Sequence, residues 1–352
     1  MDEKVVVLGA GFAGLRAALE LDGKGYEVTL VDLRKEHEYT PGVIDALRGR
    51  VPDGKLKLDI EDFLRGTGVE FEHAGVERVV PGAKKVVTGD GEIQYGSLVV
   101  SLGGEPRTFG MDVSDAHRMY SLESAKEIAS GLEDVETVLV VGSGYVGIET
   151  AGELEAAGKE VKVVDAATRP MKGSPEKASH LVLDYIDGRD IDFTGGKRVV
   201  EVGEDYVETG DGDRLEADMV IWAGGVQASE VVQESFEVEV QGMPVNSGLS
   251  SEQFTDVFAA GDSADTGAVD TAHNAIQQAE LVAENVEKAE DEQLERYEPG
   301  ETPLVVSIGK TGIFMYGDFV VKNRLLRYLK DLVRVKYFTR LRLAKLRSRL
   351  RL

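Results

Sequence analysis

Hydrophobic and polar positions follow the same order twice along this chain. Residues 6–32 open with a β-branched apolar run, pass through a glycine-rich turn into an Ala/Leu/Glu-rich stretch, and end in a second apolar run that closes on an acid. Residues 139–165 repeat that order at a constant offset, which carries Gly9 onto Gly142. Short apolar runs on either side of a helix-forming stretch predict a strand, a helix and a second strand. Each copy therefore predicts one βαβ unit with parallel strands.

The turn of each copy has the spacing G-x-G-x-x-G, and an acid ends the unit. These positions are Gly9, Gly11, Gly14 and Asp32 in the first copy, and Gly142, Gly144, Gly147 and Asp165 in the second. The first glycine permits a tight turn, the second lets backbone N–H groups approach a pyrophosphate, and the third lets the helix pack closely on the sheet. The acid can accept hydrogen bonds from ribose hydroxyls. One such turn can be a coincidence, but two in the same context predict two dinucleotide sites, as in flavoprotein reductases.

The segments between and after the repeats predict a discontinuous domain. Further strands are expected at residues 70–74, 74–80, 84–88, 97–104, 218–222 and 257–262, and helices at 56–64 and 272–288. A nucleotide domain inserted into a flavin domain explains this order, with the chain leaving near Gly103 and returning near Gly224. We expect the flavin domain at 1–104 and 222–300, the second nucleotide domain at 105–221, and a C-terminal segment at 301–352.

The composition excludes several classes of protein. The 352 residues contain no cysteine, which excludes disulfides, cysteine-ligated iron–sulfur clusters and flavoproteins that work through their own thiol pair, sulfide:quinone reductases among them. The five histidines lack metal-ligand spacing, so we expect no metal site. The longest apolar runs have strand length, so no transmembrane helix is expected. The first residues leave no room for a signal peptide, so we expect the catalytic body in the cytoplasm.

Charge is distributed unevenly along the chain. The net charge is −24, yet residues 322–352 hold twelve Lys and Arg and one acid, Asp331. The strongly acidic remainder argues against a nucleic-acid partner. Such an excess of acid also fits a protein kept soluble at high salt, with an ordinary acidic enzyme as the alternative.

The basic C-terminal residues interleave charge with apolar side chains at helical spacing. The leucines involved are Leu325, Leu329, Leu332, Leu343, Leu346 and Leu350. Leucines on one face with Lys and Arg around them indicate a helix that lies on an anionic membrane. Docking on the acidic body of the chain and a dimer interface are the alternatives. As a membrane anchor, the segment would be removable without loss of the fold or of bound FAD.

These features resemble the glutathione-reductase-type α/β fold, which has two Rossmann-like dinucleotide-binding domains. Within that fold, five segments are similar to type II NADH:quinone oxidoreductases, the single-subunit, non-pumping NADH dehydrogenases. They lie at residues 101–110, 220–229, 257–265, 271–286 and 305–323. The pattern Ala-x-x-Ala-x-Gln-Gln that begins at Ala272 and the segment after residue 305 are the most specific. The resemblance extends over essentially the whole chain.

The resemblance implies that FAD binds the first repeat and NADH the second. The FAD residues would be Gly9, Gly11, Gly14, Asp32, Gly103, Asp262 and Ala272. The NADH residues would be Gly142, Gly144, Gly147, Asp165 and Gly224. Asp262 would bond the ribityl chain, with a turn or N-cap aspartate as the alternative. The helix beginning near Ala272 would point its positive N-terminus at the flavin and stabilise its reduced form.

The catalytic residues implied are Glu149, Gln277 and Gln278. Glu149 would lie near nicotinamide and flavin, although an acid in the first turn of a helix is also favoured by the helix dipole alone. The two glutamines would hydrogen-bond a quinone carbonyl, and otherwise they are two polar residues on a helix face. Residues 39–41 resemble the loop beside the flavin ring and are weaker candidates.

The resulting expectation is a peripheral membrane enzyme at the cytoplasmic face of the cell membrane. It would move a hydride from NADH to FAD and two electrons on to a membrane quinone, without proton pumping, with residues 322–352 on the anionic membrane surface. Two alternatives stay open: a soluble NADH-dependent ferredoxin or rubredoxin reductase, and an apoptosis-inducing-factor-like flavoprotein with a binding role. A homodimer is also left open.

Overall fold

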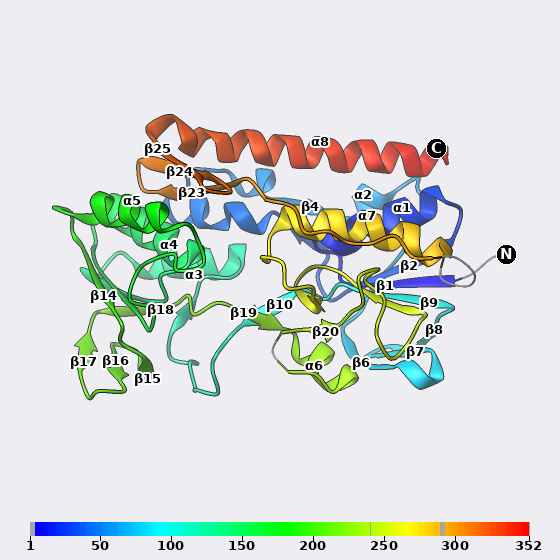
Figure 1. Cartoon of the computed structure of the whole chain (residues 1–352), viewed down its shortest axis with the longest axis horizontal. Helices are drawn as coiled ribbons and strands as arrows, with labels where there is room; N and C mark the ends of the chain where they lie inside the picture. The colour runs from blue at the N-terminus through cyan, green and yellow to red at the C-terminus, as the bar shows by residue number, and fades with distance from the viewer. Residues whose placement is uncertain (1–3, 240, 289–292, 352) are drawn as a thin grey trace.

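Two parallel sheets occupy the two ends of an elongated body, and the C-terminal helix runs along one side of it (Figure 1). The structure is a computed structural model that describes residues 4–239, 241–288 and 293–351. Both repeats form the βαβ units that the sequence predicts. They are β1 (Lys4–Leu8), α1 (Phe12–Gly23) and β2 (Glu27–Asp32), and β12 (Thr137–Val141), α4 (Tyr145–Ala156) and β13 (Glu160–Asp165). The expectation about a signal peptide falls on residues 1–3, which lie outside the described residues.

The first sheet has the strand order β21-β9-β1-β2-β5, and all its strands are parallel. Its other strands are β5 (Glu70–His73), β9 (Ser97–Val100) and β21 (Val257–Ala259). Val5 and Val7 pack toward α1 and α7 (Ala272–Lys288), whereas Val6 and Leu8 pack toward a small antiparallel sheet on the opposite face. Because both faces are covered, every side chain of the central strand after Lys4 can be apolar.

The second sheet repeats this layering with the order β11-β18-β12-β13-β14. Its further elements are β11 (His117–Arg118), β14 (Ile191–Gly195), β18 (Met219–Trp222), α3 (Leu122–Gly131) and α5 (Glu176–Ile186). Val138 and Val140 pack toward the helices, and Leu139 and Val141 toward a three-stranded antiparallel sheet. The strands β10 (Gly104–Pro106) and β19 (Val226–Ala228) pair where the chain crosses between the two sheets.

Short elements complete the two halves. The strands are β3 (Glu36–Glu38), β4 (Lys57–Asp59), β6 (Val76–Val80), β7 (Lys85–Thr88), β8 (Gly91–Gln94), β15 (Val199–Val202), β16 (Tyr206–Thr209), β17 (Arg214–Glu216), β20 (Met243–Pro244) and β22 (Ala264–Asp265). The helices are α2 (Ile60–Leu64) and α6 (Glu230–Phe236), with 3₁₀ turns η1 (Thr40–Arg48), η2 (Asp53–Lys55), η3 (Pro81–Ala83) and η4 (Gly261–Ser263).

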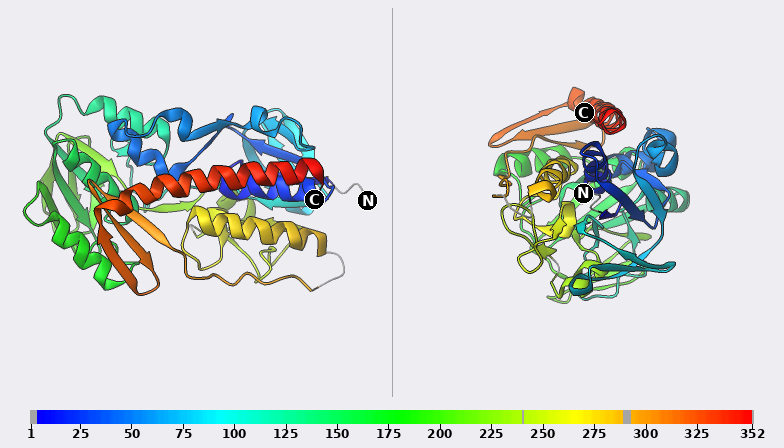
Figure 2. Two further views of the ribbon diagram at one scale, coloured as in Figure 1. Left: turned by 90° about the horizontal axis from the view of Figure 1, so that it is seen from above. Right: turned by 90° about the vertical axis from the view of Figure 1, so that its right-hand side faces the viewer.

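The C-terminal segment is an antiparallel sheet followed by a long helix. Its elements are β23 (Leu304–Ile308), β24 (Thr311–Tyr316), β25 (Phe319–Asn323), the 3₁₀ turn η5 (Arg324–Tyr328) and α8 (Leu329–Leu350). Seen from above, α8 lies over α1 with α7 beside it (Figure 2). The buried residues of α8 are Arg334, Tyr337, Leu341, Ala344 and Ser348. Their alternating spacing of three and four places them on one face, which docks on the body of the protein.

Two sequence-based predictions need correction. Residues 56–64 do not form one helix, because β4 pairs with β3 and only Ile60–Leu64 is helical, starting where the Asp59 carboxylate caps the N–H of Asp62. The long C-terminal helix begins at Leu329, since the residues before it belong to β25 and η5. The inner face of α8 docks on the body of the protein, which is one of the two alternatives that the sequence left open for this segment. None of the described helices is long and apolar enough to cross a membrane.

Candidate functional site

The two glycine-rich turns have the same backbone geometry. Gly9 has φ +89° and Gly142 has φ +104°, a region that residues with a Cβ rarely adopt. A Cβ on Gly14 would lie 1.8 Å from the carbonyl oxygen of Gly9, and one on Gly147 would lie 2.0 Å from that of Gly142. The first and third glycines of each turn are therefore required by the fold itself.

The second glycine of each turn faces open space. A Cβ built on Gly11 or on Gly144 meets no atom within 4 Å. Each of these glycines is the N-cap of its helix, α1 or α4, and no side chain caps either helix. Free N–H groups at a helix N-terminus with nothing packed against them are what a pyrophosphate requires. The residues present at both turns thus fit a dinucleotide.

The two acids also make the same hydrogen bonds. The Asp32 carboxylate accepts from the backbone N–H of Ala10 at 2.6 Å and of Arg34 at 2.7 Å. The Asp165 carboxylate accepts from the N–H of Ser143 at 2.6 Å and of Ala167 at 2.7 Å, and from the Ser143 hydroxyl at 2.7 Å. Each acid therefore fixes the residue between the first two glycines. A carboxylate has about four lone-pair sites, so acceptor capacity remains for ribose hydroxyls.

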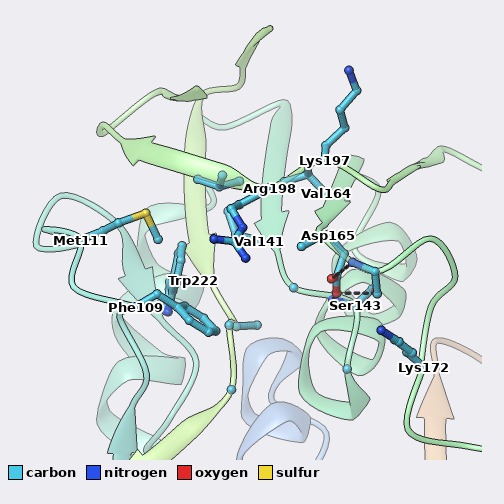
Figure 3. Close-up of a pocket in the computed structure, with 18 of the residues that line it drawn as sticks. Phe109, Met111, Val141, Ser143, Val164, Asp165, Lys172, Lys197, Arg198 and Trp222 are labelled. Atoms are coloured by element: carbon cyan, nitrogen blue, oxygen red, sulfur yellow. Dashed lines mark hydrogen bonds between the residues drawn. The ribbon is translucent and has the colours of Figure 1, made fainter. Parts of the chain in front are cut away.

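A cavity of about 560 Å³ opens beside the second turn (Figure 3). Gly142, Gly144, Asp165 and Gly224 line it, and so do the apolar side chains of Phe109, Met111, Val141, Val164 and Trp222. The indole N–H of Trp222 donates to the carbonyl of Arg107 at 2.8 Å, which holds the ring against the cavity wall. Phe109 and Trp222 are not among the predicted site residues, because nothing in their spacing connects them to the glycine turn.

Cations at this cavity differ in how they are held. Lys197 extends away from Asp165 and pairs with Asp211 and Asp213 (Figure 3). Arg169, close in sequence to Asp165, donates instead to the backbone carbonyls of Lys172 and Ser174. Lys172 and Arg198 also line the cavity, and no ion pair holds either of them within the described residues. Two cations are therefore available to the phosphates of a bound nucleotide.

Asp262, one of the predicted flavin residues, lies in η4, which packs against α7. The Asp262 carboxyl is partly buried, and burial, followed by the nearby charge of Asp270, raises its pKa to about 6. Among the described residues, its carboxylate accepts from its own backbone N–H, so lone pairs remain for ligand hydroxyls. Gln278 is buried and its Oε1 accepts from the N–H of Gly261 at 2.7 Å, so it holds the turn that carries Asp262.

Gln277 and Gln278 do not point to one site. Gln277 is exposed on α7, whereas the amide of Gln278 is occupied by the turn at Gly261. The predicted strand at 97–104 ends as β9 at Val100, and Gly103, with φ +69°, lies between β9 and β10, whereas Ala272 is the first residue of α7. The Thr271 hydroxyl accepts from the N–H of Asn274 at 3.2 Å, as an N-cap does.

Glu149 is buried, and its partner comes from the C-terminal helix. Its Oε1 lies 2.5 Å from Nζ of Lys330 and accepts from the N–H of Ser307 at 2.6 Å. Burial raises the pKa of Glu149, against the opposing effect of Lys330. Glu149 is not among the residues that line the cavity. Lys330 is not among the predicted site residues, because it is one of twelve basic residues in a segment predicted to lie on a membrane.

An aromatic cluster joins the loop at residues 39–41 to α8. Tyr39 packs against Phe12, Tyr337 and Phe338, with ring centroids 5.5–6.0 Å apart. Burial raises the pKa of Tyr39 well above its ordinary value. The side chain of His37 lies at the edge of this cluster and contacts Phe12. Residues on the first repeat and on the C-terminal helix therefore form one packed core.

The chain is similar to known proteins over most of its length. The family model for pyridine nucleotide-disulphide oxidoreductases matches residues 3–279, and the chain therefore belongs to that family, although it contains no cysteine. The type II NADH:quinone oxidoreductase of Staphylococcus haemolyticus is 31% identical, and the match covers 81% of this chain and 82% of the relative. That of Staphylococcus aureus is 27% identical and covers 94% of both chains. Within the larger family, the chain belongs to the type II NADH:quinone oxidoreductases.

Solved structures match the fold over nearly the whole chain. NDH2 from Plasmodium falciparum in complex with NADH has a TM-score of 0.83 at 15% identity and covers 99% of this chain and 98% of its own. The sulfide:quinone oxidoreductase of Aquifex aeolicus has a TM-score of 0.86 at 19% identity, covering 97% and 92%. At these identities the likeness concerns the fold alone, which is the two-domain α/β fold that the sequence predicts.

Proposed function

We propose that this chain oxidises NADH and reduces a membrane quinone, with FAD as its bound redox group. Its curated relatives are named for that activity. When bound, FAD would accept a hydride from NADH and pass two electrons on to the quinone. The observation that supports the proposal most directly is the pair of matching glycine turns, each with an open second glycine, in a chain of this family.

We assign FAD to the first repeat and NADH to the second, with the domain boundaries that the sequence predicts. The FAD domain is then 1–104 and 222–300, and the NADH domain 105–221. The open turn at Gly11 and the free carboxyl of Asp262 support the first assignment. The cavity beside Gly144 supports the second, because its apolar walls suit an adenine ring and its free cations suit phosphates.

Glu149 and Lys330 are proposed to act together in the hydride-transfer region. Glu149 lies on α4, whose N-terminus faces the NADH site, and Lys330 reaches it from α8. A buried carboxylate without its cation would be strongly disfavoured, so the pair keeps a charge in the interior that neither residue could hold alone. Gln277 stays a prediction for the quinone contact, whereas Gln278 is better explained by the turn that it holds.

The outer face of the C-terminal segment is proposed to lie on the membrane. The exposed apolar residues there are Leu325, Tyr328, Leu332, Val333, Val335, Leu343, Leu346 and Leu350. Exposed cations surround them: Lys336, Arg340, Arg342, Arg347 and Arg349. An apolar stripe with basic neighbours is typical of a helix that lies in the interface of an anionic bilayer. The cytoplasmic face, a homodimer and a high-salt habitat remain predictions.

An acceptor panel tests the proposed function. Purified, FAD-loaded protein would be reconstituted on anionic vesicles and supplied with NADH and one acceptor at a time: a long-chain quinone, a water-soluble dye, or an oxidised ferredoxin. We expect turnover with the quinone only in the presence of vesicles, and turnover with the dye in either condition. Efficient turnover with ferredoxin and none with the quinone would instead identify a soluble reductase. Failure of NADH to reduce any acceptor would exclude the enzyme.

A further inference from the structure

Glu153 is a buried carboxylate held by two arginines from the other half of the molecule. Its side chain is 1% exposed. Oε1 lies 2.7 Å from Nη1 of Arg50, and Oε2 lies 3.1 Å from Nη1 of Arg48, so each oxygen takes a different guanidinium. Arg50 also contacts the Asp45 carboxylate at 3.1 Å. The mechanism proposed above makes no use of this cluster.

The cluster joins the two nucleotide domains through the elements that follow the glycine turns. Glu153 lies nine residues, or about two and a half turns, along α4 from Gly144, the open glycine of the second repeat. Arg48 ends η1 and Arg50 follows it, and this 3₁₀ turn starts directly after Tyr39, which packs on Phe12 at the start of α1. The ion pairs therefore connect the helix behind one glycine turn to the segment beside the other.

Other polar contacts cross the same boundary but are less restrictive. Lys126 on α3 pairs with Asp53 on η2, with both side chains nearly half exposed. An exposed pair of this kind contributes little and is screened by salt. The guanidinium fork, in contrast, has fixed geometry, and a buried carboxylate accepts few other arrangements without leaving a charge unpaired. The buried cluster therefore restricts how η1 and α4 can lie against each other, within the hydrophobic core that the two halves share.

We propose that Glu153, Arg48 and Arg50 form an interdomain clamp that positions the two nucleotide sites for hydride transfer. The inference rests on the proposed function. With both nucleotides bound, the affected step would move a hydride, which is one proton with two electrons, from NADH to FAD and leave NAD⁺. Glu153 is a positioning residue in this account, because it acts only through the orientation of α4 and η1. Misplacement of reacting groups by about 1 Å can cost on the order of 100-fold in rate.

The test compares Glu153→Gln and Arg50→Gln with Asp53→Asn, a control that breaks the exposed pair across the same boundary. FAD content and amide hydrogen exchange of residues 40–48 and 145–156 are measured first, on protein without NADH. Reduction of the bound flavin by NADH and by its 4-deuterated form is then followed in single turnovers. For Glu153→Gln we expect faster exchange in both segments and flavin reduction slowed about 10- to 100-fold at saturating NADH. Asp53→Asn should match the wild type in every readout.

Each further outcome supports or overturns the clamp. A Glu153→Gln protein that retains FAD and reduces it within about twofold of the wild-type rate overturns the proposal. If the double variant Glu153→Gln/Arg50→Gln is slowed no more than Glu153→Gln alone, the carboxylate acts through the arginine, as proposed. If the two substitutions slow flavin reduction additively, the carboxylate does not act through Arg50 and the proposal is overturned. If Glu153→Gln does not fold, Arg50→Gln decides alone, since Arg48 still pairs with the carboxylate. A wild-type flavin that NADH does not reduce would reject the proposed function and not the clamp.

Discussion

The hydroxyl of Tyr337 on the C-terminal helix lies 2.7 Å from Nε2 of His37 in the first repeat. Nδ1 of His37 lies 2.8 Å from the carbonyl oxygen of Ala10, which can only accept, so this nitrogen carries the proton. Nε2 is then the acceptor for Tyr337. Because Ala10 lies between Gly9 and Gly11, the contact links α8 to the glycine turn that we assign to FAD.

This arrangement predicts a pH-dependent stability. Burial lowers the pKa of His37 from 6.5 to about 4, so the unfolded chain binds the proton more readily. The contribution of neutral His37 is then fully present above about pH 6.5 and is lost as the pH falls toward 4, by roughly 3 kcal/mol in all. Urea unfolding at several pH values gives the free energy of unfolding as a function of pH. Between pH 4.5 and 6.5 this free energy should rise less steeply with pH for His37→Gln than for the wild type. An equally steep rise in both proteins would contradict a lowered pKa for His37.

Docking of α8 predicts that its two faces respond differently to mutation. Leu341 is 3% exposed and Leu343 is 51% exposed on the same helix. Leu341→Ala should lower the free energy of unfolding by about 2–5 kcal/mol, because it leaves a cavity against the body. Leu343→Ala should change it by less than about 0.5 kcal/mol. Denaturant titrations of the pair measure both values. Equal small losses would mean that α8 does not pack as described.

Removal of residues 322–352 should therefore destabilise the whole protein. Truncation would leave Glu149 without Lys330 and His37 without Tyr337, and it would expose the surface of α1. The sequence alone favoured a removable anchor. We expect a truncated chain with a lower Tm and weaker FAD retention, measured by thermal melts and by flavin released on filtration. An equally stable, fully yellow truncated protein would restore the anchor interpretation.

Glu149→Gln should slow the nicotinamide half-reaction and leave FAD bound. The change keeps the size of the side chain but leaves Lys330 as a partly buried cation without its carboxylate. Stopped-flow reduction of the flavin by NADH should fall by at least about tenfold, and adding Lys330→Met should recover stability more than rate. If NADH reduces the flavin of Glu149→Gln as fast as that of the wild type, Glu149 has only a structural role at the start of α4.

Asp165 should favour NADH over NADPH. Its carboxylate is fixed by Ser143 and Ala167, so it cannot turn away from a 2′-phosphate, which it repels. We expect kcat/KM for NADH to exceed that for NADPH by at least about tenfold, and Asp165→Asn to narrow the ratio, helped by the free cations Lys172 and Arg198. An equal or higher kcat/KM with NADPH in the wild type would contradict the assignment.

Membrane binding should withstand molar salt if leucine burial dominates. At that ionic strength the Debye length falls to about 3 Å, which removes most of the attraction between Lys or Arg and anionic lipid. Each leucine inserted from the outer face of α8 contributes about 1.5–3 kcal/mol that salt does not weaken. Flotation of full-length protein with anionic vesicles should persist in 1 M salt, and Leu343→Glu/Leu346→Glu should abolish it. If 1 M salt releases the wild-type protein from the vesicles, its membrane contact is electrostatic and does not depend on leucine burial.

The parts of the molecule that sequence predicts well are those fixed by neighbouring residues. The glycine turns and their acids follow from local geometry, and α7 spans residues 272–288 as expected. Leu56, Ile60 and Leu64 have helical spacing because all three are buried, yet residues 57–59 pair with β3, which no local pattern reveals.

The candidate site was predictable only in part, because its most informative contacts join distant positions. Lys330 meets Glu149 across 181 residues, and Tyr337 meets His37 across 300. A basic amphipathic helix has the same sequence pattern whether it lies on a membrane or on a protein. The packing of Tyr337 and Leu341 therefore had to come from the structure.

Electron transfer from NADH through FAD to a membrane quinone can be followed in an anaerobic double-mixing experiment on vesicle-bound, FAD-loaded protein. NADH is mixed in first, and the visible absorbance of the flavin should bleach. Long-chain quinone in the same anionic vesicles is mixed in second, and we expect the absorbance to return at least as fast as steady-state turnover. A flavin that NADH bleaches, that stays bleached with the quinone and that regains its colour only with oxidised ferredoxin would show that the quinone is not the acceptor.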